Sequence, residues 1–213
     1  MLHLLDNLLR DLFIAGIDEI KDAGQTGFQP PDGEWRTHLS KLGSVNALNI
    51  YLYELRENRG LRSNEKLRSI TNGMVSEKPR PFRIECHYFI TAWSPANATP
   101  QIEPVIDEHK LLYAATAALV NNMPLNPAKI YSKGANEFAA WPEAYRETNF
   151  PTEILPAENA KTYAEFWSGM GEGARWKPLL HLVVTLPVEL THEDAAHPVE
   201  SSVIKMDFKT ESA

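Results

Sequence analysis

Apolar and polar positions along the chain alternate with two periods, one typical of helices and one of strands. Near the N-terminus the apolar residues recur every three or four positions, while Asp6, Asn7, Arg10 and Asp11 lie on the opposite side. This spacing predicts an amphipathic helix whose apolar face contains Leu4, Leu5, Leu8, Leu9, Leu12 and Phe13. Glycines and prolines from Gly24 to Gly33 then predict a loop, with a short strand inside it at "TGFQ".

Two further helices follow from the same period. Residues 105–122, "VIDEHKLLYAATAALVNN", predict a helix that ends at Asn121-Asn122 and Pro124. Its inward face is predicted to carry Ile106, Leu112, Ala115 and Leu119. Residues 159–170, "NAKTYAEFWSGM", predict a short helix that ends near two glycines.

Three segments have the pattern of core strands. Residues 47–55, "ALNIYLYEL", are rich in β-branched and aromatic residues and predict a strand buried on both faces. Residues 82–93 follow the turn signal Asn72-Gly73 and alternate, with the apolar face Phe82, Ile84, Cys86, Tyr88, Ile90 and Ala92. Residues 177–190 alternate in the same way, with Leu180, Leu182, Val184, Leu186 and Val188 on one face.

Two stretches have weaker patterns. Residues 124–156 contain five prolines and no clear period. After Leu190 the chain becomes polar, "THEDAAHPVESS", and then alternates again over residues 203–209, "VIKMDFK". We therefore expect a main domain over residues 1–190, followed by a polar linker and C-terminal extension over residues 191–213.

The composition is that of an ordinary soluble globular protein, with 43% hydrophobic and 23% charged residues in a chain of 213. No run reaches the roughly 18 apolar residues of a membrane span, and charges interrupt the N-terminal helix as they would not in a secretion signal. We expect a protein made in the cytoplasm, without a membrane partner. A formal net charge of −7 also argues against a whole-protein nucleic-acid binder.

No catalytic or metal-binding pattern emerges from the motifs. His192 and His197 are five residues apart, whereas two zinc ligands on one helical face need a spacing of four. "GMGEG" follows a helix and lacks the Lys-Ser/Thr of a phosphate-binding loop. Cys86 lies in a predicted buried strand, and Glu85 with His87 is expected to form a satisfied polar pair on a half-exposed sheet face. We expect no enzyme activity and no cofactor.

The strongest chemical asymmetry is a basic segment that begins at the end of the first core strand. From Arg56 to Arg83 there are eight basic and three acidic residues, so the segment carries +5 and the rest of the chain −12. A nucleic-acid site would need aromatic residues among the arginines for base stacking, and none lies between Arg56 and Phe82. A solvated loop and a protein interface, where arginines bind a partner's carboxylates, are the two interpretations favoured over RNA or another polyanion.

The alternating segment at residues 203–209 also has two interpretations. It can form a last strand of the protein's own sheet or a frayed tail. It can also be donated to the sheet edge of another subunit, where main-chain hydrogen bonds give affinity and alternate side chains fill pockets. The polar linker before it makes donation feasible.

Several of these motifs together resemble a known family. "NIYLYELRENRGLRSNE" (residues 49–65) resembles the core signature of the cap, or tail-terminator, proteins of extracellular contractile injection systems of the antifeeding-prophage type. Further similar segments occur in the same order: "LLDNLLRDL", "FQPPDGEW", "RPFRIECHYFITAWS", "EHKLLYAATAALVNNMPL", "FWSGMG" and "KPLLHLVVTLPVEL". Together they cover most of residues 1–190, while residues 124–156 and the tail depart from the pattern.

The resemblance implies a fold, an assembly and a set of partners. The fold would be α/β (α+β), like that of phage tail-terminator proteins: a small mixed, largely antiparallel sheet packed by helices. The assembly would be a ring of six copies on the last layer of an inner tube, in contact with the sheath, that ends polymerisation at the distal end. The subunit or tube interface would then include Arg56, Asn58, Arg59, Arg62, Asn64 and Arg68. The tail lies outside the resemblance, and its own alternating pattern predicts a donated strand that would bind the sheath through Ile204, Met206 and Phe208.

Overall fold

The structure, a computed structural model, describes residues 1–43, 45–63, 65–71, 74–94, 104–155, 160–171, 176–188 and 194–196. The chain forms two compact units, of which the first contains residues 1–58 and 83–186. The second contains residues 59–82 and the chain from Pro187 onward. The sequence pattern does not predict this division, because the second unit is assembled from two segments far apart in the chain.

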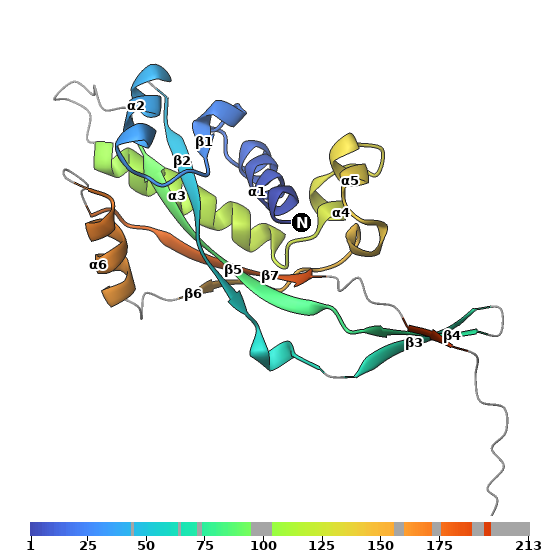
Figure 1. The fold of residues 1–213 in the computed structure, drawn as a ribbon. Coiled ribbons are helices and arrows are strands. Elements are labelled where there is room, and N and C mark those ends of the chain that lie inside the picture. The colour runs from blue at the N-terminus through green and yellow to red at the C-terminus, as the bar shows by residue number, and fades with distance from the viewer. Residues whose placement is uncertain are drawn as a thin grey trace, which may run out of the picture. The chain divides into compact units, whose positions relative to one another are not determined.

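The first unit is built on a five-stranded sheet of order β1-β2-β5-β7-β6 (Figure 1). The strands are β1 (Thr26–Gly27), β2 (Ala47–Glu57), β5 (Phe82–Trp93), β6 (Thr152–Leu155) and β7 (Leu180–Val188). β1 and β2 are parallel, whereas the β2–β5 and β6–β7 pairs are antiparallel. The expected mixed, largely antiparallel sheet is therefore confirmed, including the short strand at "TGFQ".

Helices cover both faces of this sheet. On one face lie α1 (Leu2–Gly16) and α3 (Pro104–Asn122), and the other face is covered by α2 (Gly33–Lys41) and α6 (Ala160–Gly169) (Figure 1). The predicted alternation in β5 is confirmed, because Cys86, Tyr88, Ile90 and Ala92 all join the core beneath α1 and α3. The opposite face of β5 presents His87, Phe89, Thr91 and Trp93, all of them also buried.

The α1 face of the core follows the sequence prediction closely, but α3 does not. Leu5, Leu8, Leu9, Leu12 and Phe13 are fully or almost fully buried. On α3 the prediction of an inward Ile106 is wrong, since 47% of this side chain is exposed, and Leu112 is only partly buried. The inward stripe is instead Leu111, Ala115, Ala118 and Leu119. α3 approaches α1 closely here: a Cβ on Gly16 would lie 3.1 Å from the Cβ of Ala118, so an added methyl group would require a small shift.

The stretch that has no clear sequence pattern is ordered locally by short elements. Residues 124–155 form α4 (Pro127–Ile130), α5 (Asn136–Ala140), the 3₁₀ helix η3 (Glu143–Tyr145) and strand β6. Asn126 caps α4, because its Oδ1 accepts the Ala128 N–H at 2.9 Å, and its Nδ2 donates to the Glu147 carbonyl. Trp141 and Phe150 stack with ring centroids 5.4 Å apart and are buried in the main core.

The second unit is a three-stranded antiparallel sheet of order β3-β4-β8, formed by β3 (Lys66–Thr71), β4 (Met74–Pro79) and β8 (Asp194–Ala196). β3 follows the 3₁₀ helix η2 (Arg59–Leu61). The segment expected to be a polar linker thus contributes a strand, with Ala196 paired to Val75 and Asp194 paired to Glu77.

Candidate functional site

The structure divides the predicted interface residues between the two units. Arg56 lies on β2 and Asn58 just after it, both in the first unit. Arg59, Arg62 and Arg68 belong to the second unit, which starts at Arg59. Asn64 lies outside the described residues.

Arg56 is held by a carboxylate on its own strand. Its Nη2 donates to both oxygens of Glu54 at 2.8 Å, and its Nε donates to Glu54 Oε1 at 3.2 Å. These hydrogen bonds raise the pKa of Arg56 above its ordinary value. The side chain nevertheless remains 57% exposed, so it stays accessible to a partner.

Asn58 closes the end of the β2–β5 pair. Its backbone N–H donates to the Arg83 carbonyl at 2.9 Å, and its Nδ2 donates to Glu85 Oε1 at the same distance. These contacts indicate a structural role for Asn58 at the point where the chain leaves the first unit.

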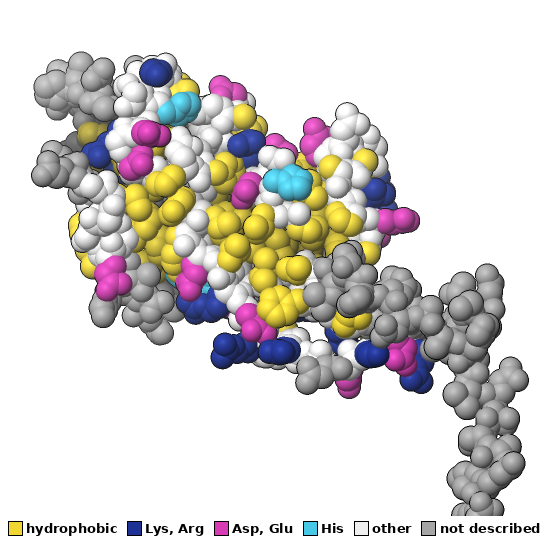
Figure 2. All heavy atoms as spheres, viewed as in Figure 1, with side chains coloured by type: hydrophobic (Ala, Val, Ile, Leu, Met, Phe, Trp, Pro, Cys, Tyr) yellow, Lys and Arg dark blue, Asp and Glu magenta, His cyan; other side chains and the backbone are white. Residues whose placement is uncertain are grey.

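In the second unit, the charged residues pair across the hairpin. Arg68 stands opposite Glu77 in the β3–β4 register, and its Nη2 donates to Glu77 Oε1 at 2.6 Å. Lys66 lies 3.4 Å from the other oxygen of Glu77, and both cations lower the pKa of this carboxyl. Arg80 pairs with Glu65 at 2.9 Å. Figure 2 shows Lys and Arg side chains beside acidic ones on the face that it draws.

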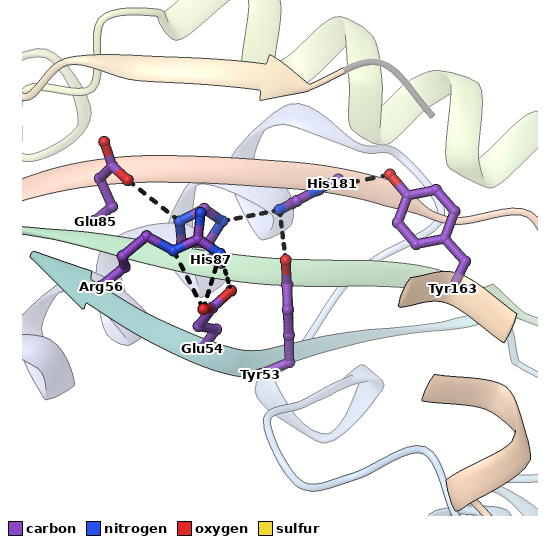
Figure 3. A network of polar contacts seen from close by, with 7 residues as sticks. All are labelled: Tyr53, Glu54, Arg56, Glu85, His87, Tyr163 and His181. Carbon is purple, nitrogen blue, oxygen red and sulfur yellow. Dashed lines mark hydrogen bonds and ion pairs between the residues drawn. The ribbon is translucent and has the colours of Figure 1, made fainter. Parts of the chain in front are cut away.

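A second polar centre lies on the face of the sheet beneath α6, where His87 of β5 meets His181 of β7 (Figure 3). His87 Nδ1 and His181 Nε2 are 3.0 Å apart, and the two side chains are 3% and 2% exposed. The expected half-exposed Glu85–His87 pair is thus wrong in its burial, and Glu85 Oε2 lies 3.5 Å from His87 Nε2. The sequence analysis does not identify His181 as the partner of His87. The only signal for it is a lone histidine in an apolar strand, "LLHLVV".

Two tyrosines complete this centre. Tyr53 Oη lies 3.0 Å from His181 Nε2, and Tyr163 Oη, from α6, lies 3.5 Å from His181 Nδ1. Burial raises the pKa of Tyr53 to about 12. Burial, followed by the nearby His87, lowers the pKa of His181 to about 4, so this imidazole is neutral at pH 7.

A β-bulge explains how β2 supplies both Tyr53 and Glu54 to this face. The register with β5 pairs Leu52 with Tyr88 and then Glu54 with His87, so Tyr53 is the extra residue. Successive residues of a regular strand point to opposite faces, and a bulge breaks that alternation. The sequence pattern of β2 does not reveal this, because the bulge adds one residue to an otherwise continuous run.

Cys86 is buried in β5. Burial raises the pKa of the Cys86 thiol to about 12, which fits the predicted inert strand cysteine. No group of three potential metal ligands occurs among the described residues, and His192 and His197 lie outside them. No helix in the described part of the chain is long and apolar enough to cross a membrane. The residues of the predicted sheath-binding strand, Ile204, Met206 and Phe208, are also outside the described residues.

Comparison with known proteins decides the family. The Pvc16 N-terminal domain family matches residues 4–201, nearly the whole chain. The chain belongs to the Pvc16 N-terminal domain family. This match and the two solved structures described below together confirm the predicted resemblance to terminator proteins of contractile injection systems. A search of the curated proteins finds no match.

Solved structures confirm the fold of this Pvc16 N-terminal domain. The sheath/tube terminator of the PVC extracellular contractile injection system, in its extended state, superposes with a TM-score of 0.65 at 20% identity. The tube-terminating cap of the anti-feeding prophage superposes with a TM-score of 0.61 at 22% identity. The matches cover 100% and 95% of this chain, but only 65% and 60% of those longer chains. The predicted tail-terminator-like α/β fold is thus confirmed.

Proposed function

We propose that this protein is a structural cap that ends the polymerisation of the inner tube and sheath at the distal end of a contractile injection particle. The observation that carries the proposal is the family match over residues 4–201, together with a terminator structure that shares the fold over the whole chain. Its partners would be inner-tube protein, sheath protein and other copies of itself. It would assemble in the cytoplasm and then remain part of a particle that can leave the cell.

We infer further that the cap is a ring of six copies. A ring requires a heterologous interface, in which one patch of a subunit binds a different patch of the next. The charge distribution suits such an interface, since the basic segment carries +5 and the rest of the chain −12. Arg56 and Arg68 are exposed although each has a carboxylate within the chain, so a neighbouring subunit's carboxylate could add to or replace that partner.

The proposed interface therefore comprises Arg56, Asn58, Arg59, Arg62, Asn64 and Arg68, and the proposed sheath contact is the strand with Ile204, Met206 and Phe208. Neither role requires a bound cofactor or a reaction. The non-enzymatic character of the proposal rests on its likeness to a sheath/tube terminator and a tube-terminating cap.

The direct test is the native mass of the purified protein, with negative-stain images of the same sample and of tube ends incubated with it. A six-subunit ring, or density added at tube ends that stop growing, is expected. A monomer that leaves tube length unchanged would contradict the proposal. If that monomer binds RNA with a steep salt dependence, the polyanion-binding alternative based on Arg56–Arg83 takes its place.

A further inference from the structure

The two buried histidines beneath α6 are joined by a hydrogen bond that can persist when one proton is added to the pair but not when two are added. His87 Nδ1 and His181 Nε2 are 3.0 Å apart, which requires one nitrogen to donate a proton and the other to accept it. One added proton can be placed on the donor ring, which then still donates to its neighbour. A second added proton leaves an N–H on both facing nitrogens, and the hydrogen bond is lost.

The charged groups around the pair can balance one imidazolium but not two. Glu85 of β5 lies 3.5 Å from His87 Nε2, and Glu54 of β2 lies opposite His87 in the register. Glu54 is already neutralised by Arg56 of the same strand. The groups from the other elements that face the pair, Tyr53 of β2 and Tyr163 of α6, carry no charge at neutral pH. Figure 3 shows this arrangement.

The pair also supports the helix that covers it. Tyr163 of α6 lies over His181, with ring centroids 6.2 Å apart, and packs edge-on against Phe89. Phe166 of the same helix stacks on Tyr51 and packs edge-on against Phe89. Because α6 has only 10 residues, its helical state depends on this packing rather than on its own propensity.

The opposite face of the sheet responds differently to acid. The buried residues of α1 and α3 include no histidine. A partly buried carboxyl on this face, that of Asp6 in α1, accepts a hydrogen bond from Tyr88 Oη at 2.8 Å, and burial raises the pKa of Asp6. Protonation of Asp6 therefore does not weaken this face.

We propose that the His87–His181 pair is an acid-sensitive latch, and that double protonation releases α6 from the sheet while α1 and α3 stay packed. The proposed latch lies within one chain, and it does not depend on the proposed capping function. The folded-state pKa of His181 lies below its ordinary value of 6.5, so the folded chain binds this proton less readily than the unfolded chain. The contribution of neutral His181 to the stability of the fold is therefore complete above pH 6.5 and is lost as the pH falls toward 4.

Hydrogen exchange of the full-length protein at pH 7, 5.5 and 4, corrected for intrinsic rates, tests the latch. We expect the α6 amides to lose protection by about tenfold or more between pH 7 and pH 4, while the α1 amides keep theirs. His181→Gln, which cannot gain a charge, should keep α6 protected at pH 4. His109→Gln, at an exposed position on α3, is the matched control and should behave like the natural chain.

Three results would overturn the proposal. One is α6 protection in the natural chain that is unchanged at pH 4, and another is a loss of protection that α1 shares to the same degree. The third is an equal loss in His181→Gln, which would assign the acid response to the carboxylates. Should His181→Gln not fold at pH 7, His87→Gln takes its place, and the comparison of α6 with α1 in the natural chain still decides.

Discussion

Arg68 on β3 stands directly opposite Glu77 on β4, and its Nη2 lies 2.6 Å from Glu77 Oε1. This pair joins the two strands of a hairpin whose cations were expected to bind a partner. Two roles are thus possible for Arg68, one within the chain and one at the interface. They can be separated because an exchange of the two residues preserves the first and changes the second.

We therefore predict the behaviour of the exchanged variant Arg68→Glu/Glu77→Arg. Its melting temperature should fall less than that of Arg68→Glu, since the exchange keeps an ion pair between the two positions and loses only the contact of Lys66 with Glu77, whereas Arg68→Glu alone places two carboxylates opposite each other. Ring formation should fall in the exchanged variant if Arg68 contacts a neighbouring subunit. Native mass spectrometry with thermal unfolding measures both properties. A ring that survives the exchange would restrict Arg68 to its role within the hairpin.

The proposed interface has a second test in Arg59 and Arg62, which lie at and just after η2. The double variant Arg59→Gln/Arg62→Gln removes two positive charges from the basic segment and should lose ring formation or tube capping. Lys110→Gln/Lys133→Gln removes the same charge from two exposed lysines outside the segment and is the matched control. Capping by the test variant that equals capping by the control would remove these arginines from the interface.

Packing at the start of the sheet gives a prediction of stability. A Cβ on Gly27 would lie 2.3 Å from Cζ3 of the buried Trp35 ring, so an added methyl group cannot be accommodated without displacement. Gly27→Ala should reduce the free energy of unfolding by about 1–3 kcal/mol, measured by urea denaturation. Gly33→Ala, at the first residue of α2 with open space around its Cβ, is expected to be neutral or stabilising by up to about 1 kcal/mol. Equal effects of the two substitutions would contradict this account.

The contact between Asp6 and Tyr88 gives a prediction of pH dependence. Burial raises the pKa of Asp6 above its ordinary value of 3.8, so the folded chain holds this proton more tightly than the unfolded chain. The stability that Asp6 provides is therefore present at low pH and is lost as the pH rises through its folded-state pKa. Asp6→Asn should gain stability relative to the natural chain as the pH rises from 4 to 7. Asp18→Asn, at an exposed position, should show no such trend in the same denaturation series.

The elements that could be predicted from sequence are those that bury one apolar face. In α1 the period of the apolar residues matches the buried positions, and in β5 it marks the face that lies beneath α1 and α3. In α3 the inward face includes Ala115 and Ala118, and Ala118 lies against Gly16 of α1. That contact joins residues about 100 positions apart, so no local pattern reports it.

The elements that the sequence analysis did not predict are held by interactions that do not recur at a regular spacing along the chain. The β3–β4 hairpin has cross-strand charge pairs such as Arg68–Glu77. Because charged and polar residues lie among the apolar ones in its strands, the sequence shows no continuous apolar face there. Between residues 124 and 156, single side chains such as Asn126 and Trp141 organise short elements through distant partners. The histidine pair depends on β5 and β7 being neighbours in the sheet, and that neighbourhood is a property of the topology.

The last prediction concerns the proposed sheath-binding strand. Deletion of residues 203–209 removes the alternating residues Ile204, Met206 and Phe208, which lie beyond β8 in the chain. The described elements of the first unit end before this segment, so the shortened chain should keep the melting temperature of the full one and assemble with the same number of subunits. Sheath attachment, measured by co-sedimentation with purified sheath protein, should weaken, because main-chain pairing and the alternate side-chain contacts are both lost.

A matched variant separates strand pairing from side-chain recognition. Ile204→Ser/Met206→Ser/Phe208→Ser keeps the backbone of the segment and removes its apolar face, so sheath binding should fall to an intermediate level. Deletion of residues 210–213, which keeps the alternating segment, is the control and should bind like the full chain. Unchanged sheath binding after deletion of residues 203–209 would refute the donated strand and leave the attachment to the main domain.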